Sequence, residues 1–200
     1  ALPISFSADG AVVARGAAFE EDIVRVTLEQ TVASGASAAS APHEPHANDA
    51  LRDLWRALVL GTRDYARKCG FTDALLGLSG GIDSALTAAI AVEALGAAQV
   101  RGVLLPSPFS SQGSLDDAHA VAQALGMTTS TLPITDAMRV MEQTLAPMFA
   151  GAPSDVAEEN IQARIRGTLL MALANKQGAL LLTTGNKSDR KSTRLNSSHT

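Results

Sequence analysis

A glycine-rich run between an apolar stretch and an alanine-rich stretch holds the residues best suited to chemistry. It consists of Gly77, Leu78, Ser79, Gly80, Gly81, Ile82, Asp83 and Ser84. Two adjacent glycines leave no Cβ in the way of an anion, and a helix that begins here adds about half a positive charge from its dipole. The run therefore predicts a phosphate site, in which Ser79 and Ser84 add hydroxyl donors.

Asp83 differs from its neighbours in this run because a carboxylate repels phosphate. Its predicted role is to hold a Mg²⁺ ion that the phosphates share. The run lacks the Gly-Lys-Ser/Thr of the Walker A loop and the Gly-x-Gly-x-x-Gly of dinucleotide-binding folds. The alternative interpretation is an ordinary strand-to-helix turn that is capped by a serine or an aspartate.

Two further segments carry polar side chains with a possible role in binding. A serine-rich segment at residues 106–114, followed by Asp116 and Asp117, comes after a predicted strand and would face the ligand side of a doubly wound sheet. Helix capping explains the same serines equally well. In the longest predicted helix, Asn160 and Arg164 lie four residues apart and share a face, which suits recognition of phosphate or carboxylate. A solvated helix face is the alternative for this pair.

Strands and helices alternate around these segments, which predicts an α/β fold with a doubly wound parallel sheet. Strands are predicted at residues 74–78, 100–105, 128–132 and 179–183. Helices are predicted on both faces of the sheet, at residues 84–95, 114–125, 135–149 and 154–176. This order would bring the glycine-rich run and the serine segment to one edge of the sheet.

The first part of the chain has a different character. Alternating residues predict strands at 6–8, 12–15 and 23–28 with an Asp9-Gly10 hairpin turn, which we interpret as the closing strands of a truncated domain over residues 1–30. Residues 31–48 are predicted to be a linker, in which His43 and His46 are solvated rather than bound to a metal.

The helix that follows the linker is predicted to begin at Asp49 as its cap and to end at Gly70. Its apolar stripe is Leu51, Leu54, Trp55, Leu58, Thr62, Tyr65, Ala66 and Cys69. Because Cys69 belongs to this stripe, we expect it to be a small core residue rather than a nucleophile.

Composition restricts the class of protein further. Apolar residues make up 46% of the 200 residues, and the formal net charge is −4. No basic stripe is present that could neutralise a nucleic-acid backbone, and no apolar run reaches membrane-spanning length. A single cysteine excludes a disulfide framework and favours a reducing cytoplasm.

Three stretches together resemble a known family. They are residues 77–84, residues 158–167 (Glu-Glu-Asn-Ile-Gln-Ala-Arg-Ile-Arg-Gly) and residues 183–188 (Thr-Thr-Gly-Asn-Lys-Ser). The first resembles the loop of ATP pyrophosphatases, of the adenine nucleotide α-hydrolase-like fold. All three, in this order, resemble the glutamine-dependent NAD⁺ synthetases. The resemblance extends over about residues 49–188, and residues 6–28 look like the end of that family's nitrilase-type glutaminase domain.

The resemblance implies a ligase that converts deamido-NAD⁺ to NAD⁺ through an adenylate, with ATP, Mg²⁺ and ammonia derived from glutamine, in a homo-oligomeric full-length enzyme. By the same resemblance residues 77–84 and Thr184 contact ATP, Asp83 binds Mg²⁺, and Asn160 and Arg164 contact deamido-NAD⁺. The alternatives are another amidotransferase with the same loop and a non-catalytic nucleotide-binding module. The glutaminase catalytic residues of the family are absent, and so are the last strand and later substrate loops of its synthetase domain, so this polypeptide alone is expected to be inactive.

The end of the chain departs from the family pattern. Asp189 stands where the family has a glutamate, and by that match it is carried over as a further deamido-NAD⁺ contact. Residues 189–200 nevertheless have no apolar periodicity and resemble a translated sequencing adapter, as do residues 1–4. We therefore expect the last twelve residues to be a non-native tail that is detached from the core.

Overall fold

The computed structural model describes residues 4–6, 10, 12–25, 47–151, 153 and 155–185. The chain divides into two compact units, residues 1–60 and residues 61–200. Each unit is described by itself below. The predicted tail at residues 189–200 and most of the predicted linker lie outside the described residues.

The first unit contains a small antiparallel hairpin. Strand β1 (Ile4–Phe6) pairs with β2 (Val12–Arg15), with an irregularity between Ser5 and Phe6, which confirms the predicted strand at 12–15 and its antiparallel pairing. The first strand lies at 4–6 rather than at the predicted 6–8, and residues 7–9, which include Asp9 of the predicted turn, lie outside the described residues. The third predicted strand is wrong over its described part, residues 23–25, which are not in a strand. The amide of Ala17 donates to the Asp22 carboxylate at 2.7 Å, so the chain before residue 23 is held in a local turn. Ile23 is 88% exposed, so it packs little against the described residues.

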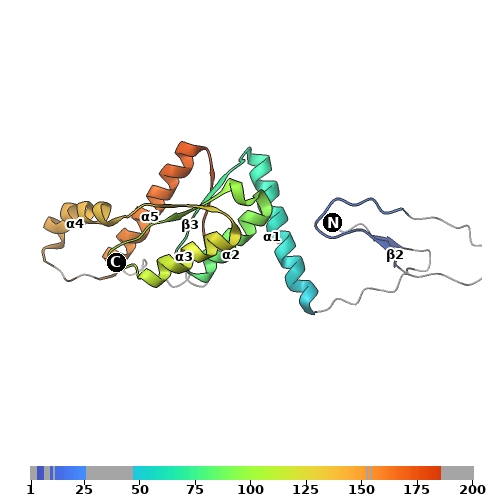
Figure 1. Cartoon of the computed structure of the whole chain (residues 1–200), viewed down its shortest axis with the longest axis horizontal. Coiled ribbons are helices and arrows are strands. Elements are labelled where there is room, and N and C mark those ends of the chain that lie inside the picture. Colours follow the sequence, from blue (N-terminus) through green and yellow to red (C-terminus); the bar gives the residue numbers. More distant parts are fainter. Residues whose placement is uncertain are drawn as a thin grey trace, which may run out of the picture. The chain divides into compact units, whose positions relative to one another are not determined.

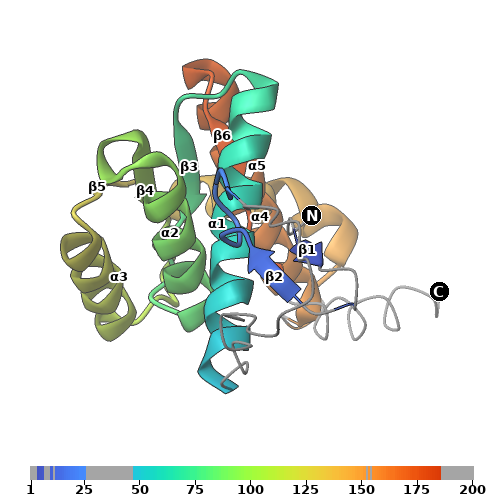
Figure 2. The ribbon, with the colours of Figure 1, turned by 90° about the vertical axis from the view of Figure 1, so that its right-hand side faces the viewer.

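The second unit is built on a four-stranded parallel sheet. Its strands are β3 (Ala74–Gly77), β4 (Val100–Leu104), β5 (Thr128–Thr131) and β6 (Leu180–Leu182), and they lie in the order β5-β4-β3-β6 (Figure 2). All three neighbouring pairs are parallel. The predicted doubly wound sheet is therefore confirmed, with each strand within about one residue of its predicted ends.

Helices cover both faces of this sheet. Helices α2 (Ile82–Leu95) and α3 (Gln112–Leu125) pack on one face, and α4 (Thr135–Phe149) and α5 (Val156–Gln177) pack on the other. A short 3-10 turn, η1 (Ala97–Gln99), leads into β4. In Figure 1, α2 and α3 lie below β3 while α5 rises behind it. The layering confirms the predicted α/β class.

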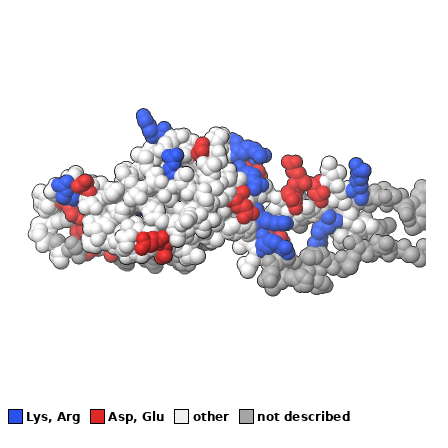
Figure 3. All heavy atoms as spheres, in the orientation of Figure 1, with Lys and Arg blue, Asp and Glu red and all other residues white. Residues whose placement is uncertain are grey.

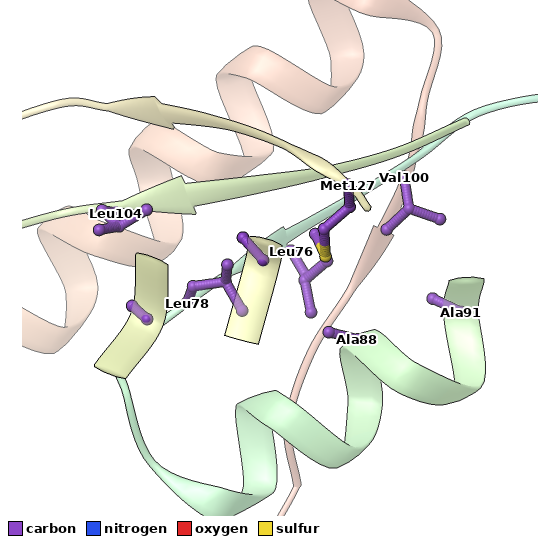
Figure 4. Close-up of a cluster of buried hydrophobic side chains, with 9 residues drawn as sticks. Leu76, Leu78, Ala88, Ala91, Val100, Leu104 and Met127 are labelled. Carbon is purple, nitrogen blue, oxygen red and sulfur yellow. The ribbon is translucent and has the colours of Figure 1, made fainter. Parts of the chain in front are cut away.

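The packing of α2 follows from its small side chains. Ala88 and Ala91 are fully buried, and Figure 4 shows their side chains on the face of α2 that is turned toward Leu76 and Met127. Alanines let the helix backbone approach the sheet closely, where apolar area is removed from water. The start of α2, which carries the glycine-rich run, is therefore anchored to the centre of the sheet.

Helix α5 has well-defined ends. Asp155 caps it and forms a capping box with Glu158, in which the Ala157 amide donates to Asp155 at 2.7 Å and the Asp155 amide donates to Glu158 at 2.7 Å. Gly178 closes the helix in the left-handed conformation, with φ 65°. This cap starts the helix two residues later than predicted.

Helix α1 (Ala47–Cys69) is present and ends directly before Gly70 as predicted, but its predicted cap and most of its predicted apolar stripe are wrong. The helix begins two residues before Asp49, so Asp49 is not its cap. Cys69 is exposed rather than a core residue. Most of the large residues of the predicted stripe are also exposed, namely Leu51, Leu54, Leu58 and Tyr65, whereas Val59 and Ala66 are buried.

The buried face of α1 has a physical cause. Arg63 Nε donates to the Ala94 carbonyl at 3.1 Å, and Arg63 Nη2 donates to the Glu93 carbonyl at 3.3 Å. These contacts to the last turn of α2 turn the face of Arg63 and Ala66 inward. Figure 3 shows that charged side chains gather along α1, whereas the face of the sheet unit in view is mostly uncharged. Among the described residues, no helix is long and apolar enough to cross a membrane.

Candidate functional site

The strand order places a switch point between β3 and β6. From β3 the chain moves outward to β4 and β5, and it then returns to the other side of β3, where Leu76 pairs with Leu182. In sheets of this kind, ligands bind outside the carboxyl ends of the strands at the switch point. The glycine-rich run follows β3 there, and Thr184 comes two residues after β6 and is exposed. These two predicted contacts with ATP therefore lie at one edge of the sheet.

Gly80 has a conformation and a surrounding that only glycine fits. Its φ is 77°, and a Cβ built on it would lie 2.3 Å from the Ser114 carbonyl oxygen. The loop after β3 is thus pressed against the first turn of α3. A side chain at this position would strain the backbone and push the two segments apart.

The two serines of the run bond mainly within the loop. Ser84 is 3% exposed, and its hydroxyl donates to the Gly81 carbonyl at 2.8 Å. The Ser79 amide donates to Ser84 Oγ at 3.3 Å, and the Gly81 amide donates to Ser79 Oγ at 3.3 Å. The hydroxyl proton of Ser84 is therefore donated within the loop, to the Gly81 carbonyl. Donation from Ser84 to a bound phosphate stays a prediction.

The first turn of α2 presents free amide groups beside a carboxylate. The Ala85 amide makes the first helical bond, to the Gly81 carbonyl at 3.1 Å. The amides of Ile82, Asp83 and Ser84 precede it, and within the described part of the chain they have no acceptor. Asp83 is exposed in the same turn and is not the helix cap, which is Gly81. This end of α2 can therefore bind an anion through its backbone while Asp83 binds a cation.

A metal at this position would have one protein carboxylate. No cluster of three or more His, Cys, Asp or Glu side chains suited to a metal occurs among the described residues. Mg²⁺ is commonly held by one or two carboxylates together with substrate phosphates, and it keeps several waters. The exposed Asp83 next to free amides fits that kind of binding.

The serine segment forms a compact loop beside the same edge. Ser111 caps α3, with the Ser114 amide donating to Ser111 Oγ at 3.2 Å, so the capping alternative holds for this residue. Ser107 is 8% exposed, and its amide donates to Ser110 Oγ at 2.9 Å. We call residues 105–111 the serine loop.

Helix α5 brings a different pair to the serine loop from the one singled out in the sequence. Arg166 Nε donates to the Leu105 carbonyl at 3.1 Å, and Ser107 Oγ donates to Gln162 Oε1 at 3.1 Å. Burial lowers the pKa of the Arg166 guanidinium from its ordinary value. Asn160 is partly buried and Arg164 is exposed, and neither side chain has a hydrogen-bond partner in the described part of the chain.

Both pairs are spaced four residues apart, on opposite flanks of the apolar line of Ile161 and Ile165. The sequence offers no signal that selects Gln162 and Arg166 over Asn160 and Arg164. The predicted contact Asp189 lies outside the described residues.

The opposite edge of the sheet also holds a cavity, of about 340 Å³. It is lined by Asp73, Gln99, Arg101, Thr128 and Gln177, among others. Two of these polar groups already bond to each other, since Arg101 Nη1 donates to Gln177 Oε1 at 3.0 Å. The cavity lies at the amino ends of the strands and includes none of the predicted site residues.

Comparison with known proteins gives a consistent match. Residues 54–192 match the family model described as NAD synthase. The glutamine-dependent NAD(+) synthetases of Synechocystis sp. and Rhodobacter capsulatus are each 51% identical to the chain, over 92% and 90% of it. The matched part is 32% of each of these relatives, so the chain spans about a third of their length.

Solved structures agree with this match. The glutamine-dependent NAD⁺ synthetase from Acinetobacter baumannii, solved in complex with ADP, has a TM-score of 0.69 and 49% identity over 72% of this chain and 27% of its own. The NH3-dependent NAD synthetase from Campylobacter jejuni has a TM-score of 0.62 and 26% identity over 69% of this chain and 58% of its own. An NMN synthetase from Francisella tularensis has a TM-score of 0.59 and 29% identity over 68% and 54%.

Proposed function

The chain belongs to the NAD synthase family, and we propose that it carries the nucleotide-binding part of a ligase that amidates deamido-NAD⁺ to NAD⁺. In the proposed reaction a carboxylate oxygen of deamido-NAD⁺ attacks the α phosphorus of ATP. The bond to the bridging oxygen breaks, and pyrophosphate leaves with the electron pair. Ammonia then attacks the acyl carbon of the adenylate, AMP leaves, and the nitrogen loses a proton to give the amide.

The free amides of Ile82, Asp83 and Ser84 at the switch point are the observation that carries this proposal. Fixed amide donors stabilise negative charge that develops on a leaving pyrophosphate, and they need no reorganisation during the reaction. We assign residues 77–84 and Thr184 to ATP on this basis. Asn160 and Arg164, on the part of α5 that reaches the same edge, are assigned to the acidic substrate.

Mg²⁺ is the metal we assign to Asp83. When bound, it would neutralise part of the phosphate charge. Asp83 would hold it from the first turn of α2, while the neighbouring amides bind phosphate oxygens. The family pattern assigns position 189 to deamido-NAD⁺. Because we also propose that a non-native tail begins there, the proposed contact belongs to that position in the family and Asp189 stands in its place here.

The remainder of the enzyme is proposed from the relatives. Residues 1–30 would close a glutaminase domain, residues 31–48 would link it to the synthetase domain, and residues 49–188 would be most of that second domain, with residues 189–200 as a non-native tail. Glutamine would supply ammonia, and the complete protein would be a cytoplasmic homo-oligomer. No nucleic acid or membrane is expected as a partner.

There are two alternatives to this function. One is a ligase that adenylates a different acid, and the other is a nucleotide-binding module that catalyses no reaction. The NMN synthetase at 29% identity has a similar fold, so the fold alone does not select the acid that is adenylated. The 51% identity to two proteins named NAD(+) synthetase favours deamido-NAD⁺. A non-catalytic module would bind nucleotide without releasing pyrophosphate.

The test is pyrophosphate release by an Asp83→Asn variant in a chain of full family length. Such a chain can be made by joining residues 1–185 to the remaining segments of the Synechocystis relative. With ATP, deamido-NAD⁺, Mg²⁺ and ammonium supplied, losing the metal ligand should lower the rate about a thousandfold or more. The control variant Glu142→Gln, an exposed carboxylate on α4 that belongs to no proposed site, should keep the original rate.

Glutamine hydrolysis by the same variants shows that the other domain of the joined chain is intact, and urea denaturation of each variant serves as the folding control for the domain that carries Asp83. Near-normal pyrophosphate release by Asp83→Asn would overturn the assignment of Asp83 to Mg²⁺. ADP binding without any pyrophosphate release by the unaltered chain would favour the non-catalytic module.

A further inference from the structure

We propose that Gln162 and Arg166 form a clamp that positions the serine loop at the carboxyl end of the sheet. The clamp thereby connects α5 with the glycine-rich run at residues 77–84, which we call the phosphate-binding loop. The kinetic part of this inference rests on the proposed function. The structural part does not. Neither residue was selected by its sequence pattern, and both act here as positioning residues.

Arg166 supplies a hydrogen bond that the sheet cannot. In a parallel strand, successive carbonyls point to opposite neighbours. The Leu104 and Pro106 carbonyls accept from Leu132 and Ile134 on the β5 side at 2.8 and 2.9 Å, and the Val103 carbonyl accepts from Leu78 on the β3 side at 2.9 Å. The Leu105 carbonyl should accept next from the β3 side, but β3 has already turned into the glycine-rich run.

Arg166 Nε takes the place of this missing donor, at 3.1 Å from the Leu105 carbonyl. A backbone acceptor that has no partner costs free energy when it is shielded from water. Without Arg166, the Leu105 carbonyl would therefore turn toward water, and the chain around it would move. The guanidinium therefore fixes the point at which the chain leaves β4.

Gln162 holds the centre of the loop. Its Oε1 accepts from Ser107 Oγ at 3.1 Å, and the same Ser107 oxygen accepts from the Phe109 amide at 3.3 Å. The Ser110 amide donates to the Ser107 carbonyl at 3.0 Å. Since Ser107 joins the loop to itself and to α5, a shift of α5 moves the whole loop.

The serine loop is connected to the phosphate-binding loop through the first turn of α3. It ends at Ser111, which caps the first turn of α3, and the Ser114 carbonyl in that turn lies against Gly80. Packed segments transmit displacement because interiors have little free space. The clamp therefore relates the helix that carries Asn160 and Arg164 to the amides that face the phosphates.

The hydrogen bond to the Leu105 carbonyl is the one polar contact that the Arg166 side chain makes with the described residues. Burial lowers the pKa of its guanidinium, which means that the charged form loses hydration there. No carboxylate among the described residues pairs with it, and its Nη groups have no acceptor in that part of the chain. A methionine would fill the same space without this loss of hydration, but it would leave the Leu105 carbonyl without its donor.

Hydrogen exchange on the chain itself tests the clamp independently of any activity. Arg166→Met should raise the exchange rate of the Ser107, Phe109 and Ser110 amides about tenfold or more, because local opening becomes easier. Exchange in α2 and in the interior of β4 should not change. Lys176→Met, on the exposed last turn of the same helix, is the matched control, and Arg166→Lys should restore part of the protection.

Kinetics in the joined full-length chain test the positioning role. Arg166→Met should lower kcat about tenfold to a hundredfold, because a small misplacement of reacting groups has that effect, while KM for ATP changes little. Combining it with Gln162→Met should add little to the loss, since both residues act through one loop. Ser107→Ala provides a second variant if Arg166→Met does not fold.

Each outcome decides one part of the proposal. Unchanged exchange of the three serine-loop amides in both Arg166→Met and Ser107→Ala would overturn the clamp. Raised exchange with unchanged kcat would overturn its role in positioning. A joined chain that releases no pyrophosphate before any substitution would count against the proposed function, and the exchange result would still decide the clamp.

Discussion

Replacing Gly80 with alanine should destabilise the fold through two effects. Substitutions at two other glycines of the chain allow these effects to be measured separately. The first is the left-handed backbone, with φ 77°, which costs an alanine about 1–2 kcal/mol. The second is the contact of the new Cβ with the Ser114 carbonyl oxygen at 2.3 Å. Contacts below 3.0 Å are essentially never seen for a real Cβ, so the two backbones must separate.

The steric effect should be of the size seen for overpacked cores, about 1–3 kcal/mol. Together the two effects predict that Gly80→Ala lowers the free energy of unfolding by about 2–5 kcal/mol. This is a large fraction of the about 5–15 kcal/mol that holds a typical domain together. Urea denaturation followed by circular dichroism measures it.

Two other glycines serve as matched controls. Gly70 has φ 78° with nothing within 4 Å of its Cβ position, so Gly70→Ala should show the backbone effect alone, about 1–2 kcal/mol. Gly61 lies inside α1 with nothing within 4 Å, so Gly61→Ala should stabilise the chain by about 0.5–1 kcal/mol. If Gly80→Ala were no more destabilising than Gly70→Ala, the close approach of the loop to α3 would be refuted.

Two further predictions follow from the same region and from α1. Ser84→Ala should lower the free energy of unfolding by about 1–3 kcal/mol, because the Gly81 carbonyl and the Ser79 amide lose their buried partner; urea denaturation would contradict this if the midpoint did not move. Cys69 should react with a thiol reagent in the folded chain at nearly the rate of a free thiol, because it is exposed. If the rate of this reaction rose only when urea unfolds the chain, Cys69 would be buried and the observed exposure would be contradicted.

The sheet unit was predictable because its signals are local and agree with each other. Apolar runs such as 74–78 can only be buried strands when a glycine turn and an alanine-rich helix follow them. The structure confirms all four strands and their parallel arrangement, and it places α4 at its predicted residues. Strand order is also consistent with the predicted doubly wound class.

Helix α1 was predicted less well because periodicity gives a helix but not the face that packs. Leu51, Leu54 and Leu58 recur at helical spacing, yet the contacts of Arg63 with α2 select another face for burial. The strand predicted at 23–28 failed, over its described part, for a related reason. An alternating pattern forms a strand only where a partner strand is available, and Ile23 has none among the described residues.

The site was predictable where residue type dictates geometry. Gly80 needs a left-handed backbone, and the sequence places it directly before a helix, so the position of the loop followed. The roles of Gln162 and Arg166 were not predictable, because they depend on which carbonyl of β4 lacks a partner. That depends on where β3 ends relative to β4, a matter of strand register rather than of local sequence.

The switch point between β3 and β6 also has a consequence for the order of folding. Ala74 pairs with Val100 on one side but with Leu180 on the other, so one edge of β3 must wait for a partner that is synthesised much later. Contacts between residues far apart in sequence form slowly, since chain entropy is lost before the contact is gained. On a ribosome, β3, β4 and β5 can assemble with α2 and α3 while β6 is still unmade. The carboxyl end of the sheet between β3 and β6 is therefore completed later than the rest of the described sheet, and until then the unpaired edge of β3 can pair with a neighbouring nascent chain.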